Sequence, residues 1–183
     1  MRNISRLLTV VVVAGVFLLL LAKVKAIYYT AIVAPSEYKN IGTPRDMISL
    51  SGGFLWYVDS QNFRLVKVNS SGQVVRTVGR EGSDEGEFEY LPTSITRDID
   101  GFLYVTTLRK IYKFDFNGGY IKSWGVYGSG AGELSEPKTI HYSGYGDYLV
   151  VSNSGNNRVS IFSLEGSLIR EFGSNGTGDG EFD

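Results

Sequence analysis

The chain has 183 residues, enough for one domain with its own hydrophobic core. It has no Cys and a single His, His141, which excludes disulfides, thiolate metal sites, a Cys nucleophile and a multi-histidine metal site within one chain. Four of its 18 basic residues lie within residues 1–26, so the remainder has 14 basic against 19 acidic residues, and this net charge of −5 argues against a nucleic-acid partner.

Residues 7–22 form the first distinct element, an uncharged apolar run that follows Arg2 and Arg6. As a helix this run would reach about 24 Å, at about 1.5 Å per residue, which is short of a hydrocarbon core of ~30 Å. Residues 1–26 are therefore interpreted either as an uncleaved signal anchor, with residues 7–22 in the membrane, or as a cleaved signal peptide.

The charges that flank this run predict on which side of a membrane the rest of the chain lies. Two arginines and the amino terminus precede it and two lysines follow it, a slight bias that favours the N-terminus inside. We expect a single-pass membrane protein with its domain outside the cytoplasm or, if the leader is cleaved, a secreted protein. Residues 27–42 form a juxtamembrane linker in which Pro35 would interrupt a strand or a helix.

From residue 43 onward the sequence repeats, and glycine marks the repeat with spacings of 46 and 48 residues. Glu and then an apolar residue follow the last glycine of each unit, and Pro44, Pro92 and Pro137 stand near the start of the three units. A shared period of this length indicates a repeat architecture. The glycine columns are Gly72, Gly118 and Gly166; Gly79, Gly125 and Gly173; Gly82, Gly128 and Gly176; and Gly86, Gly132 and Gly180.

Each unit is predicted to contain four short antiparallel strands, because apolar runs alternate with polar or glycine turns. The predicted strands are residues 46–50, 54–59, 64–69 and 74–78; 94–98, 102–106, 110–116 and 120–124; and 138–142, 148–152, 158–162 and 168–172. Four such strands in a repeat of this length are typical of a β-propeller blade. The expected fold is all-β, with blades at residues 43–91, 92–136 and 137–183 behind an N-terminal apolar helix.

The segments YVDSQNFRLVKV, YVTTLRKIYKF and VVSNSGNNRVSIF, each followed by a glycine turn and then G-x-x-G-x-x-x-G-E, resemble NHL repeats. The resemblance covers residues 43–183, and the third unit matches best, through Asn156, Asn157, Arg158 and Val159. It implies a six-bladed, TolB-like propeller, of which this chain would hold three blades.

Three blades alone would leave two sheet faces uncovered, and two expectations address this. The chain ends at residues 180–183, within the motif that would open a fourth unit, so the first expectation is that it is a fragment of a longer protein. The second is that two chains assemble as a homodimer and complete one six-bladed ring.

The predicted binding site is a loop face. Antiparallel strand order places the loop between the second and third strands of a blade at the same end as the linker to the next blade, and loops at one end of a propeller commonly bind partners. The alternative is that the same side chains cap turns and bridge strands or neighbouring blades. The candidate residues are Asp59, Asn62, Arg64, Asn153, Asn156 and Arg158.

His141 is predicted to lie on the first strand of the third unit and to line the central channel, either packed there or as a ligand or acid–base group. Residues 81–89 hold five carboxylates and residues 98–101 carry a turn pattern, but neither has the spacing of a calcium loop. We therefore expect no metal site and no cofactor. No Ser/His/Asp set can be assembled convincingly around one His.

The favoured function is a membrane-anchored or exported scaffold that binds a protein, a peptide or a glycan, because the chain combines a leader, an acidic balance and no recognisable catalytic set. The alternative is an extracytoplasmic enzyme, since propellers related to NHL repeats include lyases and lactonase-like enzymes, whose site would lie in blades beyond these three. RNA binding, known among NHL proteins, is disfavoured by the acidic balance and the export signal.

Overall fold

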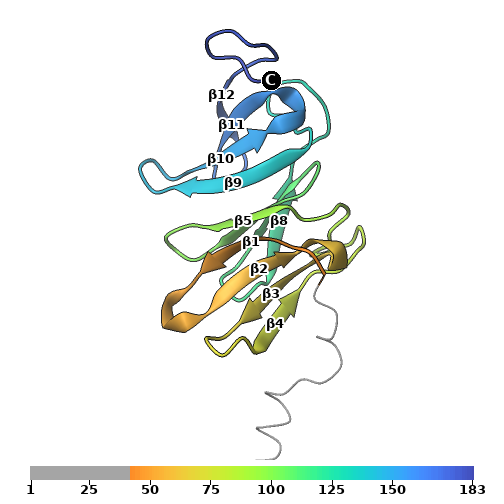
Figure 1. The fold of residues 1–183 in the computed structure, drawn as a ribbon, viewed down its shortest axis with the longest axis vertical. Helices are drawn as coiled ribbons and strands as arrows, with labels where there is room; N and C mark the ends of the chain where they lie inside the picture. Colours follow the sequence, from red (N-terminus) through yellow and green to blue (C-terminus); the bar gives the residue numbers. More distant parts are fainter. Residues whose placement is uncertain (1–41) are drawn as a thin grey trace, which may run out of the picture. The chain divides into compact units, whose positions relative to one another are not determined.

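A computed structural model describes residues 42–183, which form three four-stranded antiparallel sheets (Figure 1). Neighbours in each sheet are consecutive in the sequence, so every sheet is a meander. The predicted all-β class and the predicted four strands per unit are confirmed. The strands are β1 (Pro44–Ser49), β2 (Leu55–Asp59), β3 (Arg64–Val68), β4 (Val74–Val78), β5 (Ser94–Arg97), β6 (Leu103–Thr106), β7 (Ile111–Phe114), β8 (Tyr120–Trp124), β9 (Pro137–Ser143), β10 (Tyr148–Asn153), β11 (Arg158–Ser163) and β12 (Leu168–Phe172).

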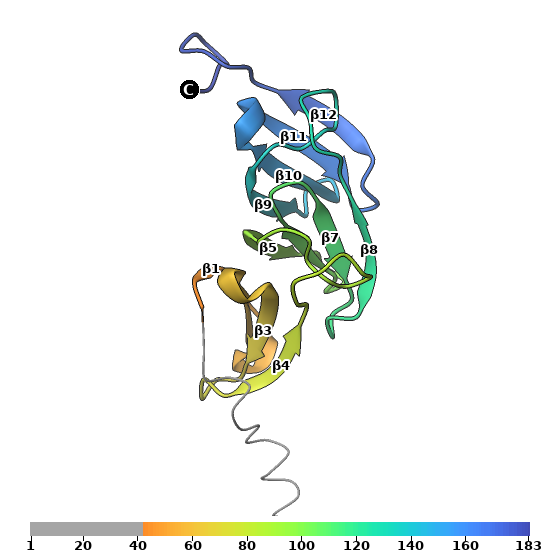
Figure 2. The same ribbon diagram turned by 90° about the vertical axis from the view of Figure 1, so that its right-hand side faces the viewer.

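The three sheets stack in sequence order, as the blades of a propeller do. The first strand of the second blade, β5, lies against both β1 and β9, so the first strands of the three blades are neighbours. Figure 2 shows β1, β5 and β9 along one side of the described residues and β4, β8 and β12 along the opposite side. We call β1, β5 and β9 the inner strands.

The hairpin between the third and fourth strands of each blade explains the first glycine column. Gly72, Gly118 and Gly166 have φ angles of 75°, 86° and 90°, a left-handed conformation that glycine adopts without a steric cost. Each donates its N–H to the carbonyl three residues earlier, and the strand register shifts beside each turn. This is the three-residue hairpin loop in which a left-handed residue forms a bulge.

Two of these hairpin glycines also rest against the preceding blade. A Cβ atom at Gly166 would lie 2.7 Å from the ring of Trp124, and one at Gly118 would lie 2.5 Å from Val78. A Cβ atom at Gly72 would have no atom within 4 Å. The absence of a side chain is therefore a packing requirement in the second and third blades, and a requirement of backbone conformation alone in the first.

The motif G-x-x-G-x-x-x-G-E folds the linker after each blade into a closed loop. The N–H of Phe88 donates to the carbonyl of Arg80 at 2.8 Å, and Leu134 and Phe182 make the equivalent bonds. The Glu that precedes each of these residues accepts a backbone N–H within the same loop, at 3.1 Å, 2.8 Å and 2.8 Å in turn. The repeated Glu thus closes the loop, which explains its place in the motif.

The first two closed loops insert their apolar residue into the core. Phe88 packs in a cluster that joins Trp56 and Leu65 of the first blade to residues of the second, and Leu134 packs in the next cluster, between the second and third blades. Phe88 and Leu134 are both 0% exposed, whereas Phe182, their equivalent after the third blade, is 40% exposed. The burial of this residue depends on the presence of a following blade.

Charged side chains add a contact between the second and third blades. Glu165, in the turn between β11 and β12, lies 2.6 Å from Nζ of Lys113 and 2.8 Å from Nζ of Lys122. Hydrogen bonds from these two lysines, Lys113 first, lower the pKa of the Glu165 carboxyl to about 2. The sequence pattern gave no indication of this contact, because it joins residues that are 52 and 43 positions apart.

Residues 42–183 include no helix that is long and apolar enough to span a membrane. The predicted leader, residues 1–26, lies outside the described residues, as does the predicted linker up to residue 41.

Candidate binding groove

The loop between β10 and β11 lies against the linker that precedes its own blade, at the same end of the blade, as the strand order predicted. Asn153 is fully buried there. Its Oδ1 accepts the N–H of Ser135 at 2.8 Å, and its Nδ2 donates to the carbonyl of Glu133 at 2.7 Å. One side chain therefore satisfies two backbone groups of the linker.

Asn156 and Arg158 bind the same linker. Nδ2 of Asn156 donates to the carbonyl of Gly128 at 2.9 Å. The guanidinium of Arg158 donates to the carbonyls of Ser129, Gly130 and Glu133 at 3.0 Å, 2.6 Å and 2.9 Å. The predicted site residues of the third blade thus hold the linker between the second and third blades in place.

In the first blade, Asp59, Asn62 and Arg64 form a polar cluster of their own. The buried carboxylate of Asp59 accepts hydrogen bonds from Nδ2 of Asn62 at 2.9 Å and from Nε of Arg64 at 2.8 Å. It also accepts the N–H of Gly42 at 2.9 Å. The six predicted loop residues therefore form two groups on different blades: those of the first blade bond to Asp59, and those of the third blade share the linker as their partner. Their role in binding stays a prediction.

The second blade has different residues in this loop. The guanidinium of Arg109 lies between two aromatic rings, 4.6 Å from the centroid of Tyr90 and 4.4 Å from that of Tyr127. Lys110 pairs with Glu89 at 2.8 Å. Cation–π contacts and an ion pair here take the place of the amide contacts of the third blade.

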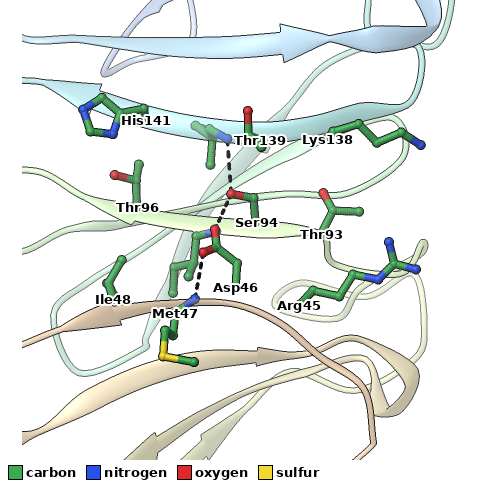
Figure 3. Close-up of a pocket in the computed structure, with 12 residues that line it drawn as sticks. Arg45, Asp46, Met47, Ile48, Thr93, Ser94, Thr96, Lys138, Thr139 and His141 are labelled. Carbon is green, nitrogen blue, oxygen red and sulfur yellow. Dashed lines mark hydrogen bonds between the residues drawn. The ribbon is translucent and has the colours of Figure 1, made fainter.

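A groove lies on the other candidate surface, along the inner strands (Figure 3). Its volume is about 480 Å³, which is within the range of small-molecule sites. All three blades contribute to it, so the groove exists only because the inner strands lie side by side. The lining residues are Arg45, Asp46, Met47, Ile48, Thr93, Ser94, Ile95, Thr96, Lys138, Thr139, Ile140 and His141.

A chain of hydrogen bonds forms the floor of this groove. Oδ2 of Asp46 on β1 accepts the hydroxyl of Ser94 at 2.5 Å and the N–H of Ile95 at 3.0 Å, both on β5. Oγ of Ser94 then accepts the N–H of Ile140 on β9 at 3.2 Å. Figure 3 shows this line of contacts from one inner strand to the next. The floor is therefore held in position by polar contacts between blades.

The charges that remain available in the groove are positive. Asp46 is its only acidic lining residue, and its other oxygen, Oδ1, accepts the N–H of Met47 at 2.8 Å. The side chain of Arg45 is exposed and makes no hydrogen bond or ion pair with another residue of the described range 42–183. Lys138 is paired with Glu136 at 3.2 Å, but both side chains are more than half exposed, which makes this a weak contact.

His141 lies on β9, is exposed and lines the groove. The prediction that it lies on the first strand of its unit is confirmed, whereas a role as ligand or acid–base group stays a prediction. Sequence reasoning missed Arg45 and Lys138. The sequence did contain a signal for them. Arg45 directly follows Pro44 and Lys138 directly follows Pro137, as Thr93 follows Pro92, so the three residues occupy equivalent positions in the three units.

A metal ion has no evident site in the described part of the chain, since no group of three or more His, Asp or Glu side chains there is placed to hold one. The five carboxylates of residues 81–89 include Glu87 and Glu89, which pair with Arg80 and Lys110. Residues 98–101 form a turn in which the N–H of Gly101 donates to the carbonyl of Asp98 at 3.2 Å.

No protein-family model matches the chain. Among solved structures, the chain is similar to a streptogramin B lyase, with 22% sequence identity, a TM-score of 0.53, and coverage of 69% of this chain and 39% of that chain. It is also similar to a catalytically inactive histidine-to-alanine variant of virginiamycin B lyase from Staphylococcus aureus with quinupristin, with 16% identity, a TM-score of 0.57, and coverage of 75% and 43%.

A third similar structure is a putative exported protein from Bacteroides fragilis, with 16% identity, a TM-score of 0.56, and coverage of 74% of this chain and 39% of that chain. The chain thus spans about two fifths of the length of these proteins. At such identities the likeness establishes the fold alone. Together with the three four-stranded sheets, it confirms the predicted β-propeller architecture.

Proposed function

We propose that this chain is part of an exported or membrane-anchored β-propeller that acts as a binding scaffold for a protein, a peptide or a glycan, and that the groove on the inner strands is its binding surface. The observation that carries the proposal is the groove itself, which all three blades line. Its cationic side chains are available to a ligand, whereas the predicted loop residues are used in contacts within the fold. The resemblance to NHL repeats supports a scaffold.

The side of the membrane is part of the same proposal. The apolar run of residues 7–22 favours export, and one of the similar structures is described as a putative exported protein. Mass spectrometry of the N-terminus of the mature protein tests this point. A chain that retains Met1 in the membrane fraction supports an anchor, and one that begins near residue 27 supports secretion. A chain that retains Met1 in the cytosolic fraction contradicts both.

The lack of Cys allows a direct test of the groove. Thr139 is exposed within it, so a fluorophore attached to a Thr139→Cys variant of the full chain reports whether the groove is occupied. A matched label at Thr177→Cys, in the exposed loop after β12, serves as the control. Both labelled proteins are titrated with the same panel of peptides and glycans.

A ligand of the groove should change the fluorescence of the Thr139→Cys label and leave the Thr177→Cys label unchanged. Competition by the same ligand against unlabelled wild-type protein then measures its affinity. If ligands bind the wild-type protein but shift neither label, the groove is not the binding surface and the proposal fails.

A lyase is the second candidate function. One observation favours it: the single His of the chain, His141, lines the groove, and one of the similar structures is a lyase made inactive by replacement of a histidine. The test is incubation with quinupristin, followed by mass spectrometry of the product. Turnover that is lost in a His141→Ala variant supports the lyase, and unchanged quinupristin contradicts it.

A further inference from the structure

We propose that one end of the groove, formed by Arg45 and Lys138, binds an anionic group of the carboxylate or phosphate type. This inference rests on the proposed function, because it specifies the chemistry that the groove recognises. Arg45 and Lys138 each directly follow the proline that begins the inner strand of their blade, so they occupy equivalent positions in the first and third blades.

The positions of the two cations point to one shared ligand. Figure 3 shows Arg45 and Lys138 extending toward the same end of the groove, with Thr93 of the intervening blade between their strands. The hydroxyl of Thr93 already has partners in the protein. It lies within hydrogen-bond distance of Thr106 in its own blade and of the carbonyl of Pro137 at 3.2 Å. Thr93 therefore acts as a spacer, and the two cations are the groups that remain to meet a ligand.

The charge balance at this end favours an anion over other ligands. Residues 27–183 carry a net charge of −5, yet both charged side chains that line this end are basic, with Glu136 beside Lys138. The one acidic residue that lines the groove, Asp46, accepts three hydrogen bonds from the protein, which leaves it little capacity to hold a cation. A positive site on an acidic domain attracts small anions while the rest of the surface repels long polyanions.

The side chains also fit the chemistry of carboxylates and phosphates. The planar guanidinium of Arg can donate two parallel N–H bonds to two oxygens of one anion, and Lys supplies a compact charge from a flexible stem. Among the described residues only Glu136 competes for Lys138, and their contact is solvent-exposed. An anion that contacts both cations can displace this weak pair at little cost.

The experiment uses the full chain, labelled with ¹⁵N, and two probes: inorganic phosphate and succinate, each against chloride at equal ionic strength. Binding of phosphate alone would indicate a phosphate group as the ligand, and binding of succinate alone would indicate a carboxylate. We expect saturable shifts of backbone amide signals at Arg45, Thr93 and Lys138. The Arg45→Gln, Lys138→Gln double variant should weaken binding by about tenfold or more, since the loss of one charge-assisted hydrogen bond alone weakens binding by roughly tenfold.

A matched double variant controls for the loss of two charges. Arg76 on β4 and Arg170 on β12 are exposed and lie on the outermost strands, so Arg76→Gln, Arg170→Gln removes the same charge far from the groove. It should bind both probes as the wild type does. Equal weakening in the two double variants, or shifts that map outside the groove, would overturn the inference. If neutral ligands shift the label on Thr139→Cys while neither anion binds, the proposed function stands and this inference fails.

Discussion

The carboxylate of Asp46 and the hydroxyl of Ser94 lie 2.5 Å apart and join the inner strands of the first two blades. Because Asp46 also accepts the N–H of Ile95 at 3.0 Å, its removal leaves a donor of the second blade without its partner. We expect Asp46→Ala to lower the free energy of unfolding by about 2 kcal/mol, as measured by urea denaturation. Asp100→Ala, an exposed turn residue, should change it by less than about 0.5 kcal/mol. Equal stability of the two variants would show that this contact does not stabilise the blades.

Asn153 offers a test of the structural interpretation of the loop residues. Its side chain is fully buried and bonds the N–H of Ser135 and the carbonyl of Glu133. Asn153→Ala should destabilise the protein by about 2 kcal/mol, because the N–H of Ser135 loses its partner and the carbonyl of Glu133 loses one of its donors. Asn117→Ala, in an exposed hairpin turn, is the matched control and should cost less than about 0.5 kcal/mol. A small effect of Asn153→Ala, together with weakened ligand binding, would instead favour the loop face as a site.

A comparison of two hairpin glycines distinguishes the cost of a steric clash from the cost of backbone strain. Gly72 and Gly166 share the same turn and similar φ angles, but only Gly166 lies against another blade, at Trp124. Both Ala variants should lose about 1 kcal/mol from the left-handed backbone, and Gly166→Ala should lose about 1–3 kcal/mol more from overpacking. The difference between their denaturation midpoints measures the second contribution. Identical losses would mean that Trp124 moves aside freely.

Glu165 makes a small part of the stability dependent on pH. Its pKa in the folded state is lowered from 4.5 to about 2 by Lys113 and Lys122, so its contribution is present above about pH 4.5 and is lost as the pH falls toward 2. Since Glu165 is 66% exposed, we expect less than about 1 kcal/mol. The difference in unfolding free energy between wild type and Glu165→Gln, measured from pH 7 to pH 2, should shrink with acidity. A difference that grows at low pH would contradict the ion pair.

Phe88 and Phe182 occupy equivalent positions with different surroundings. Phe88→Ala should cost about 3–5 kcal/mol because the side chain is fully buried between blades. Phe182→Ala should cost about 1 kcal/mol, because its side chain is 40% exposed. Denaturation at several protein concentrations gives both values. A cost for Phe182→Ala that approaches that of Phe88→Ala and rises with concentration would support the predicted homodimer, in which another copy covers this face.

The sequence predicted the strands well because each turn has its own chemical signal. The bounds of β4, β8 and β12 match the predicted residues, since a glycine with a positive φ angle fixes the start of each. The short 3₁₀ turns Ser60–Asn62 and Ser154–Asn156 were not predicted, because three residues carry no periodicity.

The candidate site was less accessible to sequence reasoning. Asn153, Asn156 and Arg158 stood out as polar residues between apolar runs, yet their partners are backbone carbonyls and amides, which a sequence does not display. Arg45 and Lys138 drew no attention, because isolated basic residues are common on surfaces. Only the side-by-side packing of the inner strands brings them to one groove.

Three of the contacts between inner strands run from a side chain of one blade to the main chain of the next. Ile95, Ile140 and Tyr142 each donate a backbone N–H to a side chain of the preceding blade: to Asp46, Ser94 and Thr96, respectively. Every residue except proline offers such a donor, whatever its side chain. At the inner strands, a unit that is duplicated or deleted in the gene would therefore keep these bonds wherever the acceptor side chain recurs, whereas contacts such as Lys113 with Glu165 and Trp124 with Gly166 would need matching residues in the adjacent unit.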